Sequence, residues 1–256
     1  MKRIRYIVVA CFTCLWCSCY QGMLLEDTFL DEENVMDVNP TPFPFSSLFP
    51  QTNGEQVTGR LGIYFLNKNQ HGMLCFAGGS LMEKSDILSR MAEKLCRKGV
   101  RVQCAIDPKM LGGKYADKDA IYDSINHIIY FKNEGGIVTP WIILHELLHA
   151  FQTHLAGVEY TVENESQSEF EVLLMQDVFE FKLWGTIPSS EGRNSKEYKK
   201  FVSQIANFEL SGNEGIAEER LIEMFKKYYK EWARGAATIY YRPSFLIYFL
   251  RYQWNF

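Results

Sequence analysis

The sequence lacks an excess of positive charge. Its 256 residues include 27 Lys and Arg against 31 Asp and Glu, which gives a formal net charge of -4 at pH 7. It also lacks a long Lys/Arg run and a glycine-rich phosphate loop. Proteins that bind nucleic acid neutralise its phosphates with clustered basic side chains. The sequence therefore predicts no nucleic-acid partner.

The apolar stretch near the N-terminus is too short to be a permanent membrane span. It covers residues 7–16 and follows the basic residues Lys2, Arg3 and Arg5, whereas a bilayer-spanning helix needs roughly 20 apolar residues. A basic segment followed by a short apolar core is typical of a secretion signal. We therefore expect an exported protein.

The end of that stretch, Leu15-Trp16-Cys17-Ser18-Cys19, resembles a bacterial lipoprotein signal. The resemblance implies that residues 1–18 are removed and that Cys19 carries diacylglycerol, which would anchor the protein to a membrane of the cell envelope. Trp16 stands where such signals usually have Leu, so an ordinary signal peptide remains the alternative. An Asp directly after the lipidated cysteine would resemble an inner-membrane retention signal. This sequence has Tyr20 at that position, which favours the outer membrane.

Few cysteines remain after that segment, namely Cys75, Cys96 and Cys104. None belongs to a CxxC pair, which argues against a cysteine-ligated metal site. In an oxidising compartment the three thiols can form at most one intramolecular disulfide. Cys96 and Cys104 either form that disulfide or remain buried free thiols.

Prolines are also few, and half of the eight fall in residues 19–59. Prolines at that density prevent regular backbone hydrogen bonding. We interpret this segment as a tether and strap, part of which packs on the domain through Phe43, Phe45, Leu48 and Phe49. Residues 60–256, in a chain that is 47% hydrophobic, are sufficient for one domain with one sizeable core.

The hydrophobic pattern of this domain predicts an α+β fold with a helix-rich second half. A loop is expected around Gly72, Gly78 and Gly79, and a helix from Ser80 or Ser85 to about Lys98. Strands are expected at 60–66, at 100–106 and within 121–131, with 128–131 as the core of the last. Further helices are expected at 141–156, 164–184, 195–210 and 216–236, and the apolar stretch 239–256 is expected to pack on the core.

The strongest chemical signal is the HExxH motif formed by residues 145–149, inside a helix opened by Thr139 and Pro140. His145 and His149 are only about 40° apart around a helix, so both imidazoles reach one ion. Two neutral imidazoles leave room for a third protein ligand and a water, which is the arrangement of a catalytic zinc site. Glu146 lies beside the ion, where it can accept a proton from that water.

Two simpler explanations of the motif are a chance match and a structural polar cluster. The sequence has five histidines, so a chance HExxH has an expected frequency below about one per cent. A structural polar cluster would bury the charge of Glu146 on an apolar helix without a partner, which is costly. A metal site explains all three residues, so we predict one bound zinc ion.

The residues after the motif decide among the classes of HExxH protein. A metzincin would continue with Gly and a third His, but Gln152 and Leu155 occupy those places. His154 points about 180° away from His145 and is not expected to be a ligand. The HExxHxxQ pattern, followed by an acidic helix, resembles secreted bacterial gluzincin-like metallopeptidases over residues 139–177.

This resemblance implies a glutamate ligand from the next helix, where Glu165, Glu169 and Glu171 are available. We assign Glu169, which follows His149 by the separation that resembles that of the thermolysin-type proteins. Glu171 projects about 200° away from Glu169 around the helix and shares its arc with Lys182, so its side chain is expected to face solvent. Glu171 and Glu165 stay open as alternative ligands. Leu173 stands where the thermolysin pattern has an Asp, so the residues that orient the ligands are expected to differ.

The resemblance also implies a zincin-like fold, with a small mixed sheet beside the active-site helix and an edge strand that can pair with an extended substrate. Zinc-dependent hydrolysis of peptide or amide bonds, with Glu146 as general base, is the expected function. Candidates for the oxyanion donor are Tyr240, Tyr241, Arg242 and His127. The alternatives are an inactive metal-binding recognition lipoprotein and a purely structural lipoprotein, and retention of Glu146 argues against both.

Overall fold

The computed structural model describes residues 43–51, 65–187, 193–207, 218–234 and 241–254. Residues 41–256 form one compact unit. The signal segment 1–18, Cys19 and residues 20–42 of the strap lie outside the described residues, so the expectations for them stay predictions. Across the ranges described, no helix combines the length and apolar character needed to cross a membrane.

The N-terminal layer contains α1 (Phe45–Leu48), α2 (Lys68–Lys84) and α3 (Asp86–Arg97). The prediction of a loop around Gly72, Gly78 and Gly79 was wrong, because α2 contains all three glycines. A capping box between Asn67 and Gln70 opens this helix, and a side chain at Gly78 would bring a Cβ to 2.1 Å from the ring of Phe45. Close packing of α1 on α2 therefore overrides the poor helix propensity of glycine.

The expected helix that ends near Lys98 is α3, and Ser85 is its N-cap, since its side chain accepts a hydrogen bond from the backbone N–H of Leu88. Phe45, Leu48 and Phe49 of the Pro-rich segment are buried in the same core. Cys96 and Cys104 are both buried and free, so they do not form a disulfide.

The sheet of the described residues has three short strands in the order β1-β3-β2. β1 (Gln103–Ile106) pairs parallel with β3 (Ile128–Phe131), and β2 (Ala120–Asp123) pairs antiparallel with β3. The expected small mixed sheet is thus confirmed, although residues 121–131 form a hairpin instead of one strand. Of the strand expected at 60–66, only Phe65 and Leu66 are described, and Phe65 makes an isolated bridge with Ala105.

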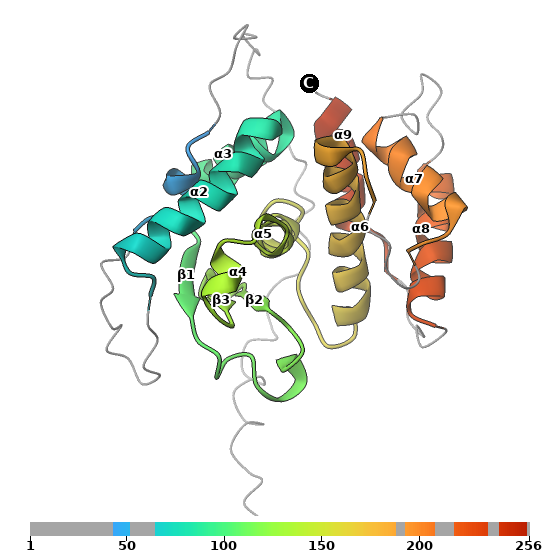
Figure 1. The fold of residues 1–256 in the computed structure, drawn as a ribbon. Helices are drawn as coiled ribbons and strands as arrows, with labels where there is room; N and C mark the ends of the chain where they lie inside the picture. The colour runs from blue at the N-terminus through green and yellow to red at the C-terminus, as the bar shows by residue number, and fades with distance from the viewer. Residues whose placement is uncertain (1–42, 52–64, 188–192, 208–217, 235–240, 255–256) are drawn as a thin grey trace, which may run out of the picture. The chain divides into compact units, whose positions relative to one another are not determined.

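After α4 (Glu134–Ile137), helix α5 (Pro140–His154) passes over the sheet. Figure 1 shows α5 end-on at the centre, with α2 and α3 on one side and α6 on the other. Pro140 occupies the first turn of α5 as expected, but the hydroxyl of Thr139 donates to the carbonyl of Gly135 and does not cap the helix. Apolar residues cover most of this helix, and they include Ile143, Leu144, Leu147, Leu148 and Phe151 in the core.

The C-terminal half consists of helices, as the sequence predicted. Helix α6 (Glu165–Trp184) packs against α5 and ends at Gly185, whose φ of 69° is the left-handed cap that glycine favours. It is followed by α7 (Lys196–Ala206), α8 (Glu218–Trp232) and α9 (Ser244–Trp254). The apolar C-terminal stretch is buried through Phe245, Leu246, Phe249 and Leu250 of α9.

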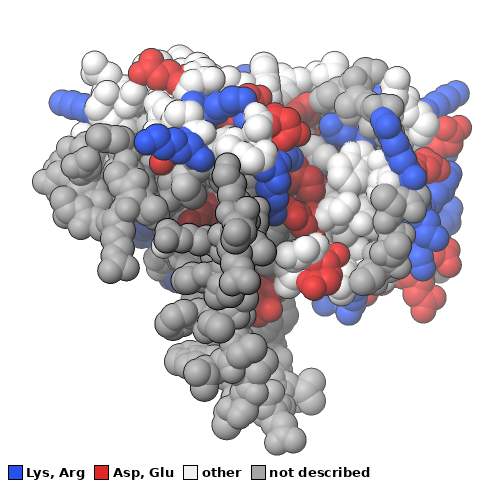
Figure 2. Space-filling model, turned by 90° about the horizontal axis from the view of Figure 1, so that it is seen from below, with Lys and Arg blue, Asp and Glu red and all other residues white. Residues whose placement is uncertain are grey.

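Charged side chains of both signs are mixed on the face of the molecule seen in Figure 2, where Lys and Arg lie among Asp and Glu over the residues drawn in colour.

Candidate metal centre

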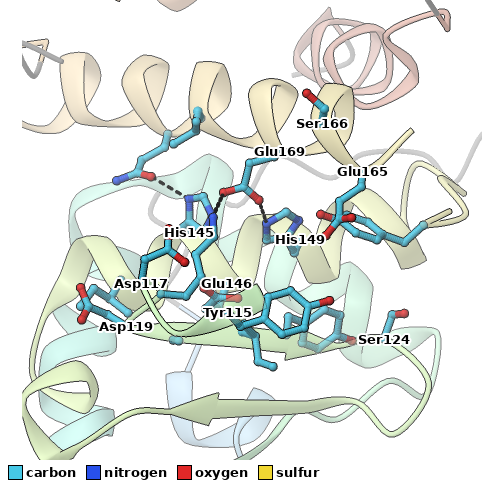
Figure 3. A pocket seen from close by; sticks show the side chains of 18 of the residues that line it. Tyr115, Asp117, Asp119, Ser124, His145, Glu146, His149, Glu165, Ser166 and Glu169 are labelled. Atoms are coloured by element: carbon cyan, nitrogen blue, oxygen red, sulfur yellow. Dashed lines mark hydrogen bonds and ion pairs between the residues drawn. The ribbon is translucent and has the colours of Figure 1, made fainter. Parts of the chain in front are cut away.

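His145 and His149 project from one side of α5, and their rings meet edge to face with centroids 4.9 Å apart. The opposite faces of the helix are held in the core by Leu144, Leu147 and Leu148. This packing fixes the rotation of α5 about its axis. Both imidazoles consequently face the neighbouring helix α6, as Figure 3 shows.

Glu169 of α6 points down between these two rings (Figure 3). Its Oε1 lies 3.4 Å from Nε2 of His145, and its Oε2 lies 3.3 Å from Nε2 of His149. The chain turns at Gly157, whose φ is 69°, before α6 returns beside α5. The three side chains offer ligand atoms that all lie within 4.8 Å of one another, so the structure brings together the three residues that the sequence selected.

Two glutamines orient the histidines from behind. Nδ1 of His145 donates to Oε1 of Gln176 at 3.0 Å, and Nδ1 of His149 donates to Oε1 of Gln152 at 3.3 Å. A neutral imidazole with its proton on Nδ1 presents the lone pair of Nε2. Both lone pairs then face a carboxylate, an arrangement that could hold a cation between them. The donor set of two imidazole nitrogens and one carboxylate fits a catalytic zinc ion.

The glutamines are themselves fixed by buried glutamates. Nε2 of Gln176 donates to Glu180 at 2.7 Å, and Nε2 of Gln152 donates to Glu171 at 3.0 Å. Leu173, at the position where the thermolysin-type pattern has an Asp, makes no hydrogen bond to either histidine. The groups that contact Nδ1 of the two histidines are amides on two different helices.

The ionisation of the cluster follows from burial and from these contacts. Burial alone would raise the pKa of Glu169, but its hydrogen bonds with the two imidazoles hold that pKa well below its usual range. Burial lowers the pKa of His145, while the hydrogen bond to Glu169 and the charges of Glu146 and Glu169 raise it, and the net direction is upward. The cluster thus favours the ionised carboxylate of Glu169, a negatively charged group between the two imidazoles.

Glu146 lies beside the histidines and lines the same cavity. Its side chain is only 4% exposed, and burial raises its pKa above the usual value for a glutamate. The nearby charges of His145 and His149 act in the opposite direction. A carboxyl group with a raised pKa is better suited to accept and return a proton near neutral pH.

The cluster opens on a cavity of about 700 Å³. Its wall includes Ala120, Ile121 and Tyr122 of β2, an edge strand of the sheet among the described residues. Lys118 also lines it, and its Nζ lies 2.7 Å from Oε1 of Glu169. Aromatic side chains complete the wall, namely Tyr115, Trp141 and Tyr160.

Glu165 and Glu171, the alternatives to Glu169, have other roles. Glu165 lies at the cavity wall and pairs with Lys114 at 3.1 Å. The expectation that Glu171 faces solvent was wrong, because its side chain is 2% exposed. Its carboxylate accepts hydrogen bonds from the backbone N–H of Leu246 and from Gln152, so it joins α9 to the support of His149.

The expected oxyanion donors are not brought to the cavity. The backbone of Tyr241 exchanges hydrogen bonds with Gln167, Arg242 pairs with Glu218, and His127 contacts His154. Tyr240 lies outside the described residues. The structure instead places Lys118 and Tyr160 there, and the ring of Tyr160 lies 5.9 Å from that of His149. Both are in loops, where no periodic pattern of the sequence could have placed them.

The supporting glutamines did have a sequence signal. Gln152 follows His149 by three residues and Gln176 follows Glu169 by seven, so each shares a helix face with a ligand.

Comparison of the chain with protein-family models, with curated proteins and with solved structures gave no match.

Proposed function

We propose that this protein is a zinc-dependent hydrolase of peptide or amide bonds. One observation carries the proposal: Nε2 of His145, Nε2 of His149 and the carboxylate of Glu169 converge at the wall of a cavity that also contains the buried Glu146. A site that only bound metal for stability would have no need of an adjacent proton acceptor or of an open cavity.

The chain's own residues have distinct tasks in this mechanism. When bound, zinc would supply an acidified water and a Lewis acid for the substrate carbonyl. His145, His149 and Glu169 would hold the ion, with the two imidazoles oriented by Gln176 and Gln152. The carboxylate of Glu146 takes the proton from the attacking water and passes it to the nitrogen of the leaving amine.

The edge strand supports a peptide as the substrate. β2 pairs with β3 on one side, and its other edge has no partner strand among the described residues. Because β2 also lines the cavity, an extended peptide that paired with its backbone would pass close to Glu146 and Glu169. This arrangement favours a protein or peptide substrate, including cell-wall peptides, and it supports the zincin-like fold as part of the proposal.

Export and a lipid anchor at Cys19 are also part of the proposal, on the N-terminal sequence alone. The chain would then act in the cell envelope on peptides outside the cytoplasm. An inactive recognition lipoprotein is the alternative, but the buried Glu146 beside the cluster disfavours it.

The experiment that tests this function combines metal analysis with digestion of a mixed peptide library. The full chain is expressed in bacteria with its leader, and mass spectrometry first shows whether the mature protein begins at a diacylated Cys19. We expect cleavage of the library, loss of cleavage when a chelator removes the metal, and recovery when Zn²⁺ is added back. Zinc binding without cleavage of any peptide would favour the recognition lipoprotein.

A second test concerns Lys118, the one Lys or Arg among the described residues that line the cavity. Because its ammonium group lies beside Glu169, it is placed to stabilise negative charge on the carbonyl oxygen. Lys118→Met should lower kcat by about a hundredfold while KM and zinc content change little. Lys114→Met is the matched control, since Lys114 pairs with Glu165 and is largely exposed. If Lys118→Met loses zinc but keeps kcat per bound zinc, Lys118 only positions Glu169.

A further inference from the structure

A second group of metal-ligand atoms lies at the end of α5, separate from the HExxH cluster. His154 is the last residue of α5, Tyr122 belongs to β2, and His127 precedes β3 in the hairpin. Nε2 of His154 lies 2.7 Å from the hydroxyl of Tyr122 and 3.1 Å from Nδ1 of His127. The third side of this triangle, from the hydroxyl of Tyr122 to Nδ1 of His127, is 3.4 Å.

Hydrogen bonds account for two of the three distances. The hydroxyl of Tyr122 can donate to Nε2 of His154 and accept from Nδ1 of His127. The two nitrogens then lie 3.1 Å apart without a hydrogen bond between them, since each imidazole nitrogen has a single in-plane direction for one proton or one lone pair. Two imidazole nitrogens and one phenol oxygen within 3.4 Å of one another are also a donor set that one cation can share.

The size of the triangle fits a transition-metal ion. An ion about 1 Å above the plane of the three atoms would lie about 2 Å from each of them, the distance at which zinc binds nitrogen and oxygen. Two of the sides, 2.7 and 3.1 Å, are shorter than the distances within the HExxH cluster, where the nitrogens lie 3.3 and 3.4 Å from Glu169, and the third side is 3.4 Å.

The surroundings leave the donors available to an ion. All three side chains are partly buried. Burial, the charge of His127 and the charge of Lys98 lower the pKa of His154, whereas burial and the charge of Asp123 raise the pKa of Tyr122, so an ion would have to displace the phenolic proton. Nζ of Lys98 is held by the backbone carbonyl of His154 at 3.2 Å. His127 has a φ of 55°, a conformation in which Gly or Asn would be more usual.

We propose that His127, His154 and Tyr122 form a second site for a divalent transition-metal ion such as Zn²⁺. The site is distinct from the HExxH cluster and does not depend on hydrolytic activity. An ion bound there joins the end of α5 to the hairpin of β2 and β3. Tyr122 also lines the catalytic cavity, so the bound ion would fix one wall of that cavity.

The test is the number of Zn²⁺ ions bound by the full chain, measured by calorimetric titration and by elemental analysis after gel filtration. The parent should bind two equivalents, and His145→Ala/His149→Ala should bind one. Adding His154→Ala to that double variant should leave none. His71→Gln is the matched control, because His71 is the one histidine of the five that belongs to neither cluster, and it hydrogen-bonds the carbonyl of Phe49. It should keep both equivalents.

Two less disruptive variants separate loss of a metal ligand from loss of the fold. His127→Asn keeps a residue that tolerates the left-handed backbone, and Tyr122→Phe removes only the hydroxyl; each should weaken the second equivalent by at least tenfold without changing the circular-dichroism spectrum. In the His145→Ala/His149→Ala variant, Co²⁺ should give the visible absorption of a tetrahedral site. A parent that binds one equivalent, or a second equivalent that survives both His127→Asn and His154→Ala, would overturn the proposal.

Discussion

Replacement of Glu146 by Gln should lower kcat for peptide hydrolysis by about a thousandfold or more and leave one zinc ion bound at the HExxH cluster. The amide has nearly the shape of the carboxylate but cannot accept the proton of the attacking water. Zinc affinity should be preserved because His145, His149 and Glu169 supply the ligand atoms. Burial already raises the pKa of Glu146, so a neutral side chain at this place should not lower the stability of the fold.

The measurement pairs steady-state kinetics on a peptide from the library with the zinc content of the same sample. His145→Ala provides the contrast, since it should lose both the metal and the activity. Equal kcat in Glu146→Gln and the parent would refute the proposed proton transfer, even if both proteins bind zinc.

Glu169→Ala should lower the affinity for zinc at the HExxH cluster by about a hundredfold or more and abolish hydrolysis at low zinc concentration. This side chain faces both imidazoles, and its removal leaves an ion with two protein ligands. Competition with a chelator of known affinity measures the loss, and the His154→Ala background removes any contribution of the second site.

Glu165→Ala is the matched control on the same helix. Its carboxylate pairs with Lys114 beyond the histidines, so its removal should change zinc affinity by less than about twofold. Glu171 is unsuitable as a control, because this buried acceptor holds the backbone N–H of Leu246 and its loss should destabilise the packing of α9. If Glu165→Ala weakens zinc and Glu169→Ala does not, the assignment of the third ligand is wrong.

The sequence predicted the residues that gather at the metal centre because helical periodicity defines direction. His145 and His149 share one face of α5. Glu169 on the next helix was assigned from a separation that resembles that of the thermolysin-type proteins, and helical geometry then separated it from Glu171. The periodicity of α6 also set Glu171 apart from Glu169, but it could not reveal that α9 covers the opposite face and buries Glu171.

Other features depended on contacts between distant segments. The glycines of α2 read as a loop because glycine is a poor helix former, and only the ring of Phe45 explains why Gly78 is needed inside a helix. Lys118 reaches Glu169 from a loop about fifty residues earlier in the chain, and no local pattern encodes such a contact. The triangle of His127, His154 and Tyr122 likewise joins a helix end to a hairpin.

The two glutamates behind the glutamines have an effect on tautomers. An ionised carboxylate can only accept hydrogen bonds, so in their ionised forms Glu180 and Glu171 require Gln176 and Gln152 to turn their NH₂ groups toward them. Burial raises the pKa of both glutamates, that of Glu171 to about 7, so this requirement is strongest above neutral pH. Each glutamine must then present its carbonyl oxygen to Nδ1 of a histidine. If either amide were rotated by 180°, that histidine would carry its proton on Nε2 and would repel a cation. Side chains that never touch the ion therefore select which ring nitrogen is free to bind it.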